Sequence, residues 1–316
     1  MPADRGQDAS SLRLIFDKHT AVMMDERVTL VNIAFRMLGC AHEAEDVVHE
    51  AFARWFALSD EARREIRSPV AWLVRVTCRI CLDQLGSARA RRERYVGDWL
   101  PEPLPDDSRW GGTGRNSSGD PAERVALDDS VSMGMLVMLE SVTPAERVAF
   151  ILHDVFDLPH TEIAGIVGRS AESSRQLAAS ARRHLRSDRR RAVSTHQHRS
   201  IVSAFRNACE HGDLDTLIGL LDPQVTVRAD GGGKVRAALR PILGPEKTAR
   251  YFLGLLRNRF ARELTEENVN GCPGLVSHAD GEVNGIMAFA VRGGRITQIW
   301  VIVNPDKLHA WKGSGL

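Results

Sequence analysis

The sequence lacks any apolar run that approaches the roughly 18 residues needed to cross a bilayer, and no apolar signal segment follows its first residues, Met1 to Arg5. We therefore expect a cytoplasmic protein with no membrane partner. Cysteine is scarce, with five residues scattered over 316 positions. An odd number of cysteines at such spacing argues against a disulfide framework, so reduced thiols are expected.

Net charge is also nearly absent, at +1, but the balance conceals segments of opposite sign. Residues 61–94 contain nine arginines and four acidic residues, and residues 169–191 contain eight arginines and two acidic residues. Residues 98–129 contain eight acidic residues and three arginines, among many prolines, glycines and serines. The sequence therefore predicts two basic patches separated by an acidic linker.

Hydrophobic periodicity is helical from about Leu12 to Arg94 and again from Pro121 to about Arg191. Past Gln197 the pattern changes. It predicts a helix near residues 201–221, a strand at 225–227 and a hairpin at 286–303 that turns at Gly293-Gly294. With 316 residues, 43% of them hydrophobic, the chain can form two or three small cores. The predicted fold class is two all-α modules followed by an α+β domain.

One predicted helix, residues 44–56, has an apolar face formed by Val47, Ala51 and Trp55, while Asp46 and Glu50 line another edge. A helical hairpin with a solvated acidic edge would explain this pattern. Farther along, residues 68–73 (SPVAWL) begin a basic helix. Two thiols, Cys78 and Cys81, share a face of that helix, and buried thiols explain them better than a zinc or redox site.

These two helices together resemble region 2 of the sigma-70 family, in which the first docks on the clamp helices of the polymerase β′ subunit and the second opens the minus-ten promoter element. The sequence departs from the family at His49, where Gln is usual, and at Gly86, where Arg is frequent. Trp72 is expected in the core rather than stacked on a base. The resemblance implies that Asp46, Glu50 and Phe52 bind core polymerase and that Arg75, Arg79, Arg89, Arg91 and Arg92 bind DNA.

A second motif follows a helix start at Thr143-Pro144-Ala145-Glu146, which has the pattern of a capping box. Ala164 inside a helix, Gly168 at a turn and Ser170 as a cap predict a helix-turn-helix. This stretch resembles sigma region 4, which binds the minus-thirty-five element and the β flap. By position, Glu172, Ser173, Arg175 and Gln176 could reach base edges and Arg182 and Arg183 phosphates. The run Arg189 to Arg191 fits a solvated charge cluster equally well.

Three short motifs resemble those of the SigJ-like group of extracytoplasmic-function sigma factors, which carry a fused, cone-shaped SnoaL/NTF-like domain taken to regulate the sigma part in cis. They are residues 99–103 (WLPEP), 230–234 (DGGGK) and 304–308 (NPDKL). The triple glycine is better explained as a tight turn than as a P-loop. The resemblance implies interdomain roles for Trp99, Leu100, Pro101, Asp230, Gly231, Gly232, Asn304, Pro305, Asp306, Lys307 and Leu308.

The expected segments are a region 2 module (1–97), an acidic flexible linker (98–130), a region 4 helix-turn-helix (131–192) and a SnoaL-like regulatory domain (197–316). The linker could mimic nucleic acid in a basic polymerase channel. The tail at 304–316 could clamp the two modules. The partners expected are core RNA polymerase and promoter DNA, with a small ligand of the C-terminal domain as an option.

Other functions remain open at this point. A stand-alone helix-turn-helix regulator would need no polymerase. An enzyme of the SnoaL type would need a catalytic base and an acid pair, and Asp230, Tyr251, His278 and Asp280 show no matching spacing. We predict no catalytic residue, no metal site and no cofactor.

Overall fold

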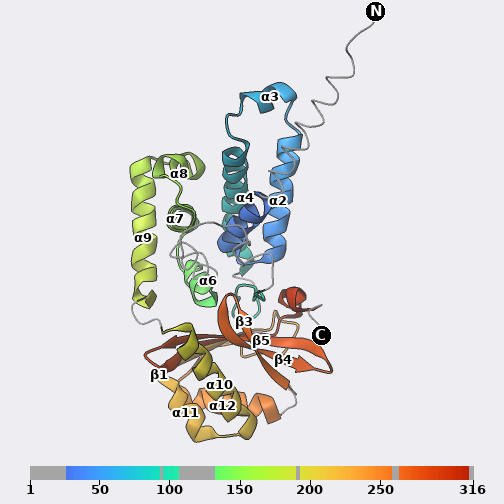
Figure 1. Ribbon diagram of the computed structural model, residues 1–316, viewed down its shortest axis with the longest axis vertical. Helices are drawn as coiled ribbons and strands as arrows, with labels where there is room; N and C mark the ends of the chain where they lie inside the picture. Colours follow the sequence, from blue (N-terminus) through green and yellow to red (C-terminus); the bar gives the residue numbers. More distant parts are fainter. Residues whose placement is uncertain (1–25, 93–94, 107–131, 190–192, 258–262, 313–316) are drawn as a thin grey trace, which may run out of the picture.

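The computed structural model of the protein describes residues 26–92, 95–106, 132–189, 193–257 and 263–312, with the side chains of residues 87–92, 186–189 and 256–257 left out (Figure 1). Three parts are distinguished below. The first helical module is residues 26–92, the second helical module is residues 132–189, and the C-terminal domain is residues 193–312.

The first helical module consists of a helix over residues 26–38 and helices α2 (Ala41–Phe56), α3 (Asp60–Glu65) and α4 (Pro69–Arg92). The apolar face expected on α2 is buried, and Trp55 contacts Trp72 edge to face at 5.3 Å between ring centroids. Trp72 is therefore half-buried and packs against the core, as expected. Cys78 and Cys81 are fully buried, and burial raises the pKa of both thiols, as expected of packing residues.

The second helical module contains α6 (Met133–Leu139), α7 (Pro144–Phe150), a π-helical turn η1 (Ile151–Val155), α8 (His160–Val167) and α9 (Ala171–Arg189). The capping box is present, because the side chains and amides of Thr143 and Glu146 exchange hydrogen bonds. Gly168 ends α8 at φ +67°, and the Ser170 hydroxyl accepts from the Ser173 amide. The predicted helix-turn-helix is confirmed.

The C-terminal domain begins with α10 (Thr195–His211) and α11 (Leu214–Leu220). The single helix expected near residues 201–221 is thus two helices, because Gly212 at φ +69° ends the first. Strands β1 (Leu221–Asp230) and β2 (Ile242–Leu243), helix α12 (Pro245–Arg257) and strands β3 (Glu263–Val269), β4 (Cys272–Ala279), β5 (Glu282–Arg292) and β6 (Arg295–Ile302) follow. Two short 3-10 turns, η2 (Pro305–Lys307) and η3 (His309–Trp311), complete it.

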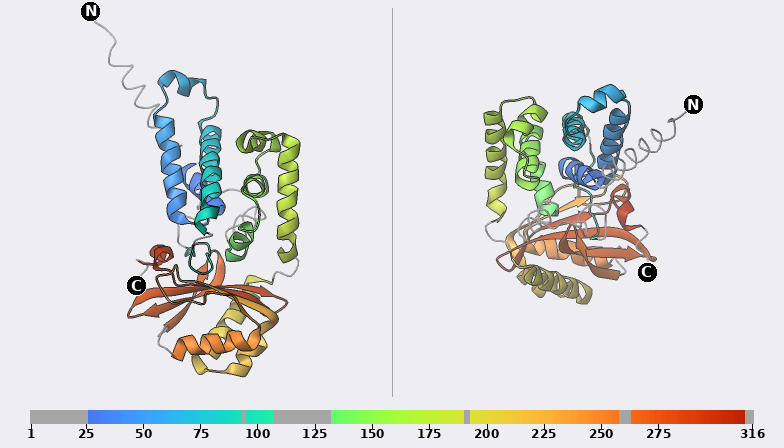
Figure 2. Two further views of the ribbon diagram at one scale, coloured as in Figure 1. Left: turned by 180° about the vertical axis from the view of Figure 1, so that it is seen from behind. Right: turned by 45° about the horizontal axis from the view of Figure 1, so that its top comes forward.

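The six strands form one sheet in the order β2-β1-β6-β5-β4-β3, in which β1 and β6 are parallel and all other neighbours antiparallel. The predicted hairpin is β5–β6, and it turns at Gly293 and Gly294, both with positive φ. Helices α10 to α12 lie on one face of the sheet, and the two helical modules stand side by side on the other (Figures 1 and 2). The expected combination of two all-α modules with an α+β, SnoaL-like domain is confirmed.

Among the described helices, none is long and apolar enough to cross a membrane.

The expected linker differs from the structure in its described part. Residues 95–106, here called the strap, are packed between the first helical module and the C-terminal domain, and Leu100 and Leu104 are buried. The strap is extended because its prolines exclude a helix and its apolar side chains find partners on the sheet. The rest of the acidic segment, residues 107–131, lies outside the described residues.

Candidate functional site

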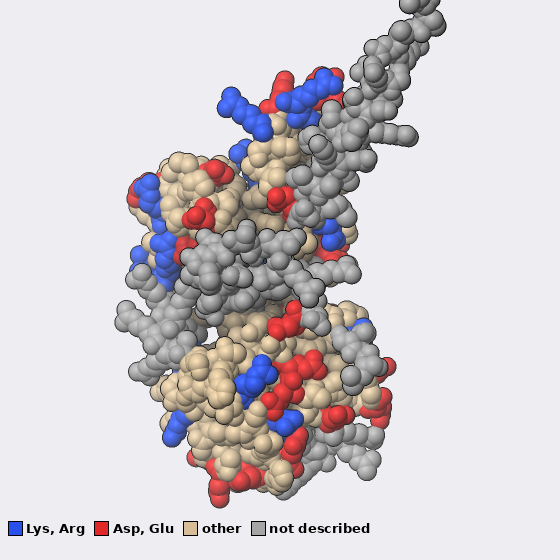
Figure 3. All heavy atoms as spheres, viewed as in Figure 1, with Lys and Arg blue, Asp and Glu red and all other residues tan. Residues whose placement is uncertain are grey.

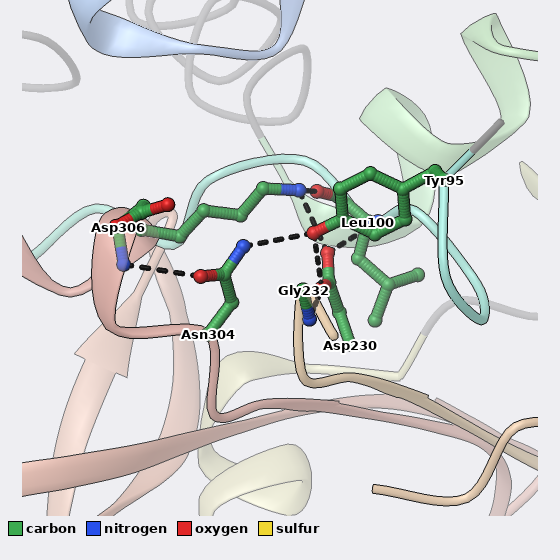
Figure 4. A network of polar contacts seen from close by, with 7 residues as sticks. Tyr95, Leu100, Asp230, Gly232, Asn304 and Asp306 are labelled. Carbon is green, nitrogen blue, oxygen red and sulfur yellow. Dashed lines mark hydrogen bonds and ion pairs between the residues drawn. The ribbon is translucent and has the colours of Figure 1, made fainter. Parts of the chain in front are cut away.

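A buried carboxylate at the end of β1 joins the C-terminal domain to the strap. Asp230 is fully buried, and its Oδ1 accepts from the Tyr95 hydroxyl at 2.6 Å and from the Gly232 amide at 3.0 Å. Its Oδ2 accepts from the Leu100 amide at 2.9 Å and from Lys307 Nζ at 2.7 Å. Four donors satisfy the carboxylate, which makes its burial tolerable. Figure 4 shows these contacts converging between the strap and the segments that follow β1 and β6.

Lys307 supplies the opposite charge and is itself buried. Besides Asp230, its ammonium donates to the Leu100 carbonyl. The ammonium lies 4.1 Å from the centroid of the Trp99 ring and 5.4 Å from that of Tyr95, and a cation is attracted to the faces of aromatic rings. Because the pair is desolvated, removal of either partner would leave an uncompensated buried charge.

Asn304 and the triple glycine complete the arrangement. Asn304 Nδ2 donates to the Tyr95 hydroxyl at 2.8 Å, and its Oδ1 accepts from the Asp306 amide at 3.1 Å. A Cβ on Gly232, whose φ is +61°, would lie 2.5 Å from the Asn304 side chain. The glycines thus form a tight turn that allows this approach. We call the six side chains and backbone groups at this point the latch: Tyr95, Trp99, Leu100, Asp230, Asn304 and Lys307.

Burial and the hydrogen bond to Asp230 raise the pKa of the Tyr95 hydroxyl. The phenol therefore stays protonated at neutral pH and can donate to the carboxylate. The neighbouring pair Lys234–Asp306, at 2.6 Å, has both side chains more than half exposed. It lies at the rim, where an ion pair contributes little.

Not every residue of the expected interdomain set belongs to the latch. Leu308 is buried in the apolar cluster on the sheet face, Gly231 is buried beside the Val235 carbonyl, and Pro101 packs near Gly39. Pro305 begins the 3-10 turn that carries Lys307. The structure thus brings the three motifs together.

Other contributors were missed because no motif marked them. Trp311 Nε1 donates to the Pro103 carbonyl at 2.8 Å, and Asn270 exchanges hydrogen bonds with Leu104 across 166 residues. Tyr95 lies four residues before the WLPEP motif. A buried tyrosine next to a proline-rich motif is a weak signal that could have been followed.

The second helical module also contacts the sheet. Met133 of α6 joins an apolar cluster with Trp300, Ile302 and Leu100. The surface of Gly134 lies against Trp300, so that a Cβ there would be 3.3 Å from Trp300 Cη2. One sheet face therefore holds both the strap and the second module.

The two helical modules contact each other as well. Arg147 of α7 is buried and donates to the Met37 carbonyl at 2.6 Å and to Glu140 at 2.7 Å. Arg79 Nη2 of α4 donates to the Gly165 carbonyl of α8 at 3.0 Å. One of the arginines expected to bind DNA is thus engaged by the other module.

The remaining residues of the first module expected to bind polymerase or DNA lie as follows. Asp46 and Glu50 are exposed on α2, and Phe52 is half-buried and stacks on Phe56. Arg75 is exposed. Arg89, Arg91 and Arg92 lie in the last turns of α4, and their side chains are outside the described part.

In the second module the expected base-reading residues occupy the start of α9. Glu172 and Arg175 are exposed and pair at 2.5 Å, Gln176 is exposed, and Ser173 is half-buried. Arg182 is bound by Asp154 through two hydrogen bonds of 2.5 and 2.6 Å, whereas Arg183 is exposed. The run at 189–191 lies almost wholly outside the described residues. Basic side chains gather along the outer edge of this module and around α3 (Figure 3).

A cavity lies inside the C-terminal domain between α10, α12 and the sheet, and apolar side chains such as Phe205, Phe252 and Met287 line it. Its volume of about 20 Å³ has room for about one water molecule. The acid–base candidates do not meet there: Asp230 belongs to the latch, His278 bonds Thr265, and Asp280 is in a turn. Among the described residues, no cluster of acidic, histidine or cysteine side chains could hold a metal ion.

Comparison with family models matches residues 23–91 to sigma-70 region 2 and residues 133–185 to sigma-70 region 4.

The chain is also similar to curated proteins along nearly its whole length. It is 39% identical over 304 residues to the probable ECF RNA polymerase sigma factor SigI of Mycobacterium tuberculosis, and the alignment covers 95% of this chain and 99% of that protein. It is 37% identical over 294 residues to the ECF RNA polymerase sigma factor SigJ of the same organism, covering 89% and 90%. The crystal structure of that SigJ superposes with a TM-score of 0.70 at 34% identity, over 92% of this chain and 98% of the other.

Proposed function

Because the chain belongs to the extracytoplasmic-function sigma factors of the sigma-70 family and is an alternative sigma factor, we propose that its C-terminal domain regulates the two sigma modules in cis. A sigma factor acts with core RNA polymerase and promoter DNA, so the stand-alone regulator is the weaker account. The protein then works in the cytoplasm, where its polymerase is.

The observation that carries the proposal is the buried pair Asp230–Lys307, enclosed by Tyr95, Trp99 and Leu100 of the strap. Both partners of this ion pair belong to the C-terminal domain, and each also binds the strap, so the pair gives the strap a defined position against that domain. The strap follows α4 in the sequence and caps α2 through Glu102, so the state of the latch bears on the module that opens the minus-ten element.

In the arrangement described above, Arg79 contacts the second module and the helix-turn-helix stands against the first. We assign this arrangement to the free factor. On polymerase, α2 docks on the β′ clamp helices through Asp46, Glu50 and Phe52, while the second module separates to reach the β flap and the minus-thirty-five element. Arg75 and Arg79, with Arg89, Arg91 and Arg92, then lie along the minus-ten DNA, and the start of α9 lies in a major groove.

For the C-terminal domain itself we propose a regulatory contact and no enzymatic activity. The cavity is too small for a substrate, and the only carboxylate of the triple-glycine motif is occupied by four donors. Catalysis would require convergent acid and base groups facing the cavity.

Runoff transcription with bacterial core polymerase tests the proposal, on templates that include the region upstream of the protein's own gene. The wild-type chain is compared with Lys307→Met, with Lys234→Met as a matched control at the exposed pair, and with a chain that ends at residue 196. Start sites that depend on the protein, with an output that Lys307→Met and the truncation change and Lys234→Met does not, are expected. Equal output from all four proteins would contradict regulation in cis.

A further inference from the structure

The polymerase-docking helix α2 begins without a cap of its own. Its N-cap residue is Cys40, whose side chain makes no capping hydrogen bond. The first backbone amides of a helix have no partners within the helix, and serine, threonine, aspartate or asparagine normally supplies one.

An acceptor for the first amide of α2 comes from the strap, 61 residues away in the chain. Glu102 Oε2 accepts from the Ala41 amide, the first residue of α2, at 2.7 Å, and Glu102 is only 5% exposed. The Glu102 amide donates in turn to the Gly39 carbonyl at 2.8 Å. A carboxylate at this end also interacts favourably with the helix dipole.

The strap is held in register for this contact on its other side. Lys307 binds the Leu100 carbonyl, Trp311 binds the Pro103 carbonyl, and Asn270 bonds Leu104. Gly39 at φ +69° lies against Trp99 and Pro101, where a Cβ would be 3.0 Å from the Trp99 ring. Glu102 thus lies between Leu100 and Pro103, whose carbonyls are both bound by the C-terminal domain, and its side chain points to α2.

We propose that Glu102 is a positioning residue for polymerase binding, which caps α2 from the strap and so couples the latch to the docking helix. Asp46 and Glu50 lie in the second and third turns of that helix, and a frayed first turn loosens their placement. The C-terminal domain then supports the docking helix as well as holding the modules. The inference rests on the proposed docking role of α2.

The test uses the full chain with Glu102→Ala, which removes the cap, and Glu102→Gln, which keeps an acceptor oxygen. Ser194→Ala is the matched control, because Ser194 caps α10 of the C-terminal domain through the Gln197 amide at 3.2 Å. Affinity for core polymerase is measured by fluorescence anisotropy, and hydrogen exchange of the first-turn amides of α2 by mass spectrometry.

Glu102→Ala is expected to weaken polymerase binding about tenfold and to speed exchange in the first turn of α2 about tenfold. Glu102→Gln should recover most of both effects, and Ser194→Ala should change neither. Lys307→Met should speed exchange at the same amides if the strap transmits the state of the latch.

Polymerase affinity for Glu102→Ala within twofold of wild type would overturn the proposal. So would faster exchange spread evenly over α2, α9 and α10, which indicates loss of stability alone. If Glu102→Ala does not fold, Lys307→Met decides by the same two measurements, and unchanged exchange in the first turn of α2 with unchanged polymerase affinity would then overturn the proposal. A wild-type chain that fails to bind core polymerase would instead refute the docking role of α2 itself.

Discussion

Two lysines near the domain boundary make ion pairs, of which one is buried and the other is exposed to solvent. Lys307 and Asp230 are 9% and 0% exposed, whereas Lys234 and Asp306 are 56% and 58% exposed. Lys307→Met should lower the free energy of unfolding by about 3–5 kcal/mol, because it leaves Asp230 charged and buried. Lys234→Met should lower it by less than about 1 kcal/mol. Urea unfolding followed by circular dichroism measures both, and equal losses would show that the buried pair has no special weight.

A second residue, His198 of α10, gives the C-terminal domain a pH dependence. Its Nε2 atom is buried with no hydrogen-bond partner among the described residues, and burial lowers the pKa of His198 to about 4. Below pH 6.5 the unfolded chain binds a proton that the folded chain does not. The stability contributed by the neutral imidazole is therefore complete above pH 6.5 and is lost as the pH falls towards 4.

The expected loss is at most about 3 kcal/mol between those limits, because each unit of pKa difference corresponds to about 1.4 kcal/mol. His198→Phe should remove this part of the pH dependence. Measured at pH 7, 5.5 and 4.5, the unfolding free energy of the wild type should therefore fall relative to that of His198→Phe as the pH falls. A constant difference between them at all three values would contradict the assignment.

At the scale of elements, the recognition helix α9 is anchored by an ion pair. Arg182 binds Asp154 of η1 through two hydrogen bonds, and this partner raises the pKa of Arg182. We therefore expect Arg182 to hold α9 in place and the exposed Arg183 to meet a phosphate.

Arg183→Ala should weaken promoter binding by the holoenzyme and reduce the slope of log affinity against log salt by about 1, since one phosphate contact is lost. Arg182→Ala should instead lower stability by about 2 kcal/mol, as expected for hydrogen bonds to a charged group, and Asp154→Ala should do the same. Salt titrations and urea unfolding separate the two roles. A reduced salt slope with unchanged stability for Arg182→Ala would reverse the assignment.

The elements differ in how far the sequence predicts them. The capping box at Thr143 and Glu146 and the turn at Gly168 depend on residues a few positions apart, so their signals are local and the structure confirms them. The resemblance implied interdomain roles for Trp99, Leu100 and Pro101, but the segment around them was expected to be a flexible linker and not a packed strap. Proline, aspartate and glycine around it are typical of linkers, and its hydrogen-bond partners in the C-terminal domain lie 130 to 209 residues away.

The same limit applies to the latch. The motifs identified Asp230, Asn304 and Lys307, but the spacing of the motifs gives no information on which atoms meet. Glu102 lies inside the WLPEP motif and Tyr95 lies four residues before it, but the motif gives no information that Glu102 meets α2 or that Tyr95 meets Asp230. Long-range pairs depend on the register of the sheet and on the path of the strap across its end, which periodicity does not fix.

At the scale of the whole molecule, the sheet holds the two helical modules through separate contacts. The strap attaches the first module through the latch, and α6 attaches the second through Met133 and Gly134 against Trp300. A third set of contacts joins the modules directly, through Arg147 on the Met37 carbonyl and Arg79 on the Gly165 carbonyl. Each of the three parts thus contacts the other two. We expect that loss of one set of contacts weakens the other two sets and allows the two helical modules to separate.

Gly134 offers the sharpest way to break one of these sets of contacts. A Cβ there would already lie 3.3 Å from Trp300 Cη2, so Gly134→Val drives branched methyls into the ring and separates α6 from the sheet. Gly86 of α4 is the matched control, because a Cβ there would have no heavy atom within 4 Å.

Small-angle scattering of the free factor should show a larger radius of gyration for Gly134→Val and an unchanged radius for Gly86→Val. If the second module separates from the first on polymerase, as we propose, Gly134→Val should also raise promoter-specific transcription at limiting factor. A larger radius without a gain in transcription would mean that the closed arrangement does not restrain the factor.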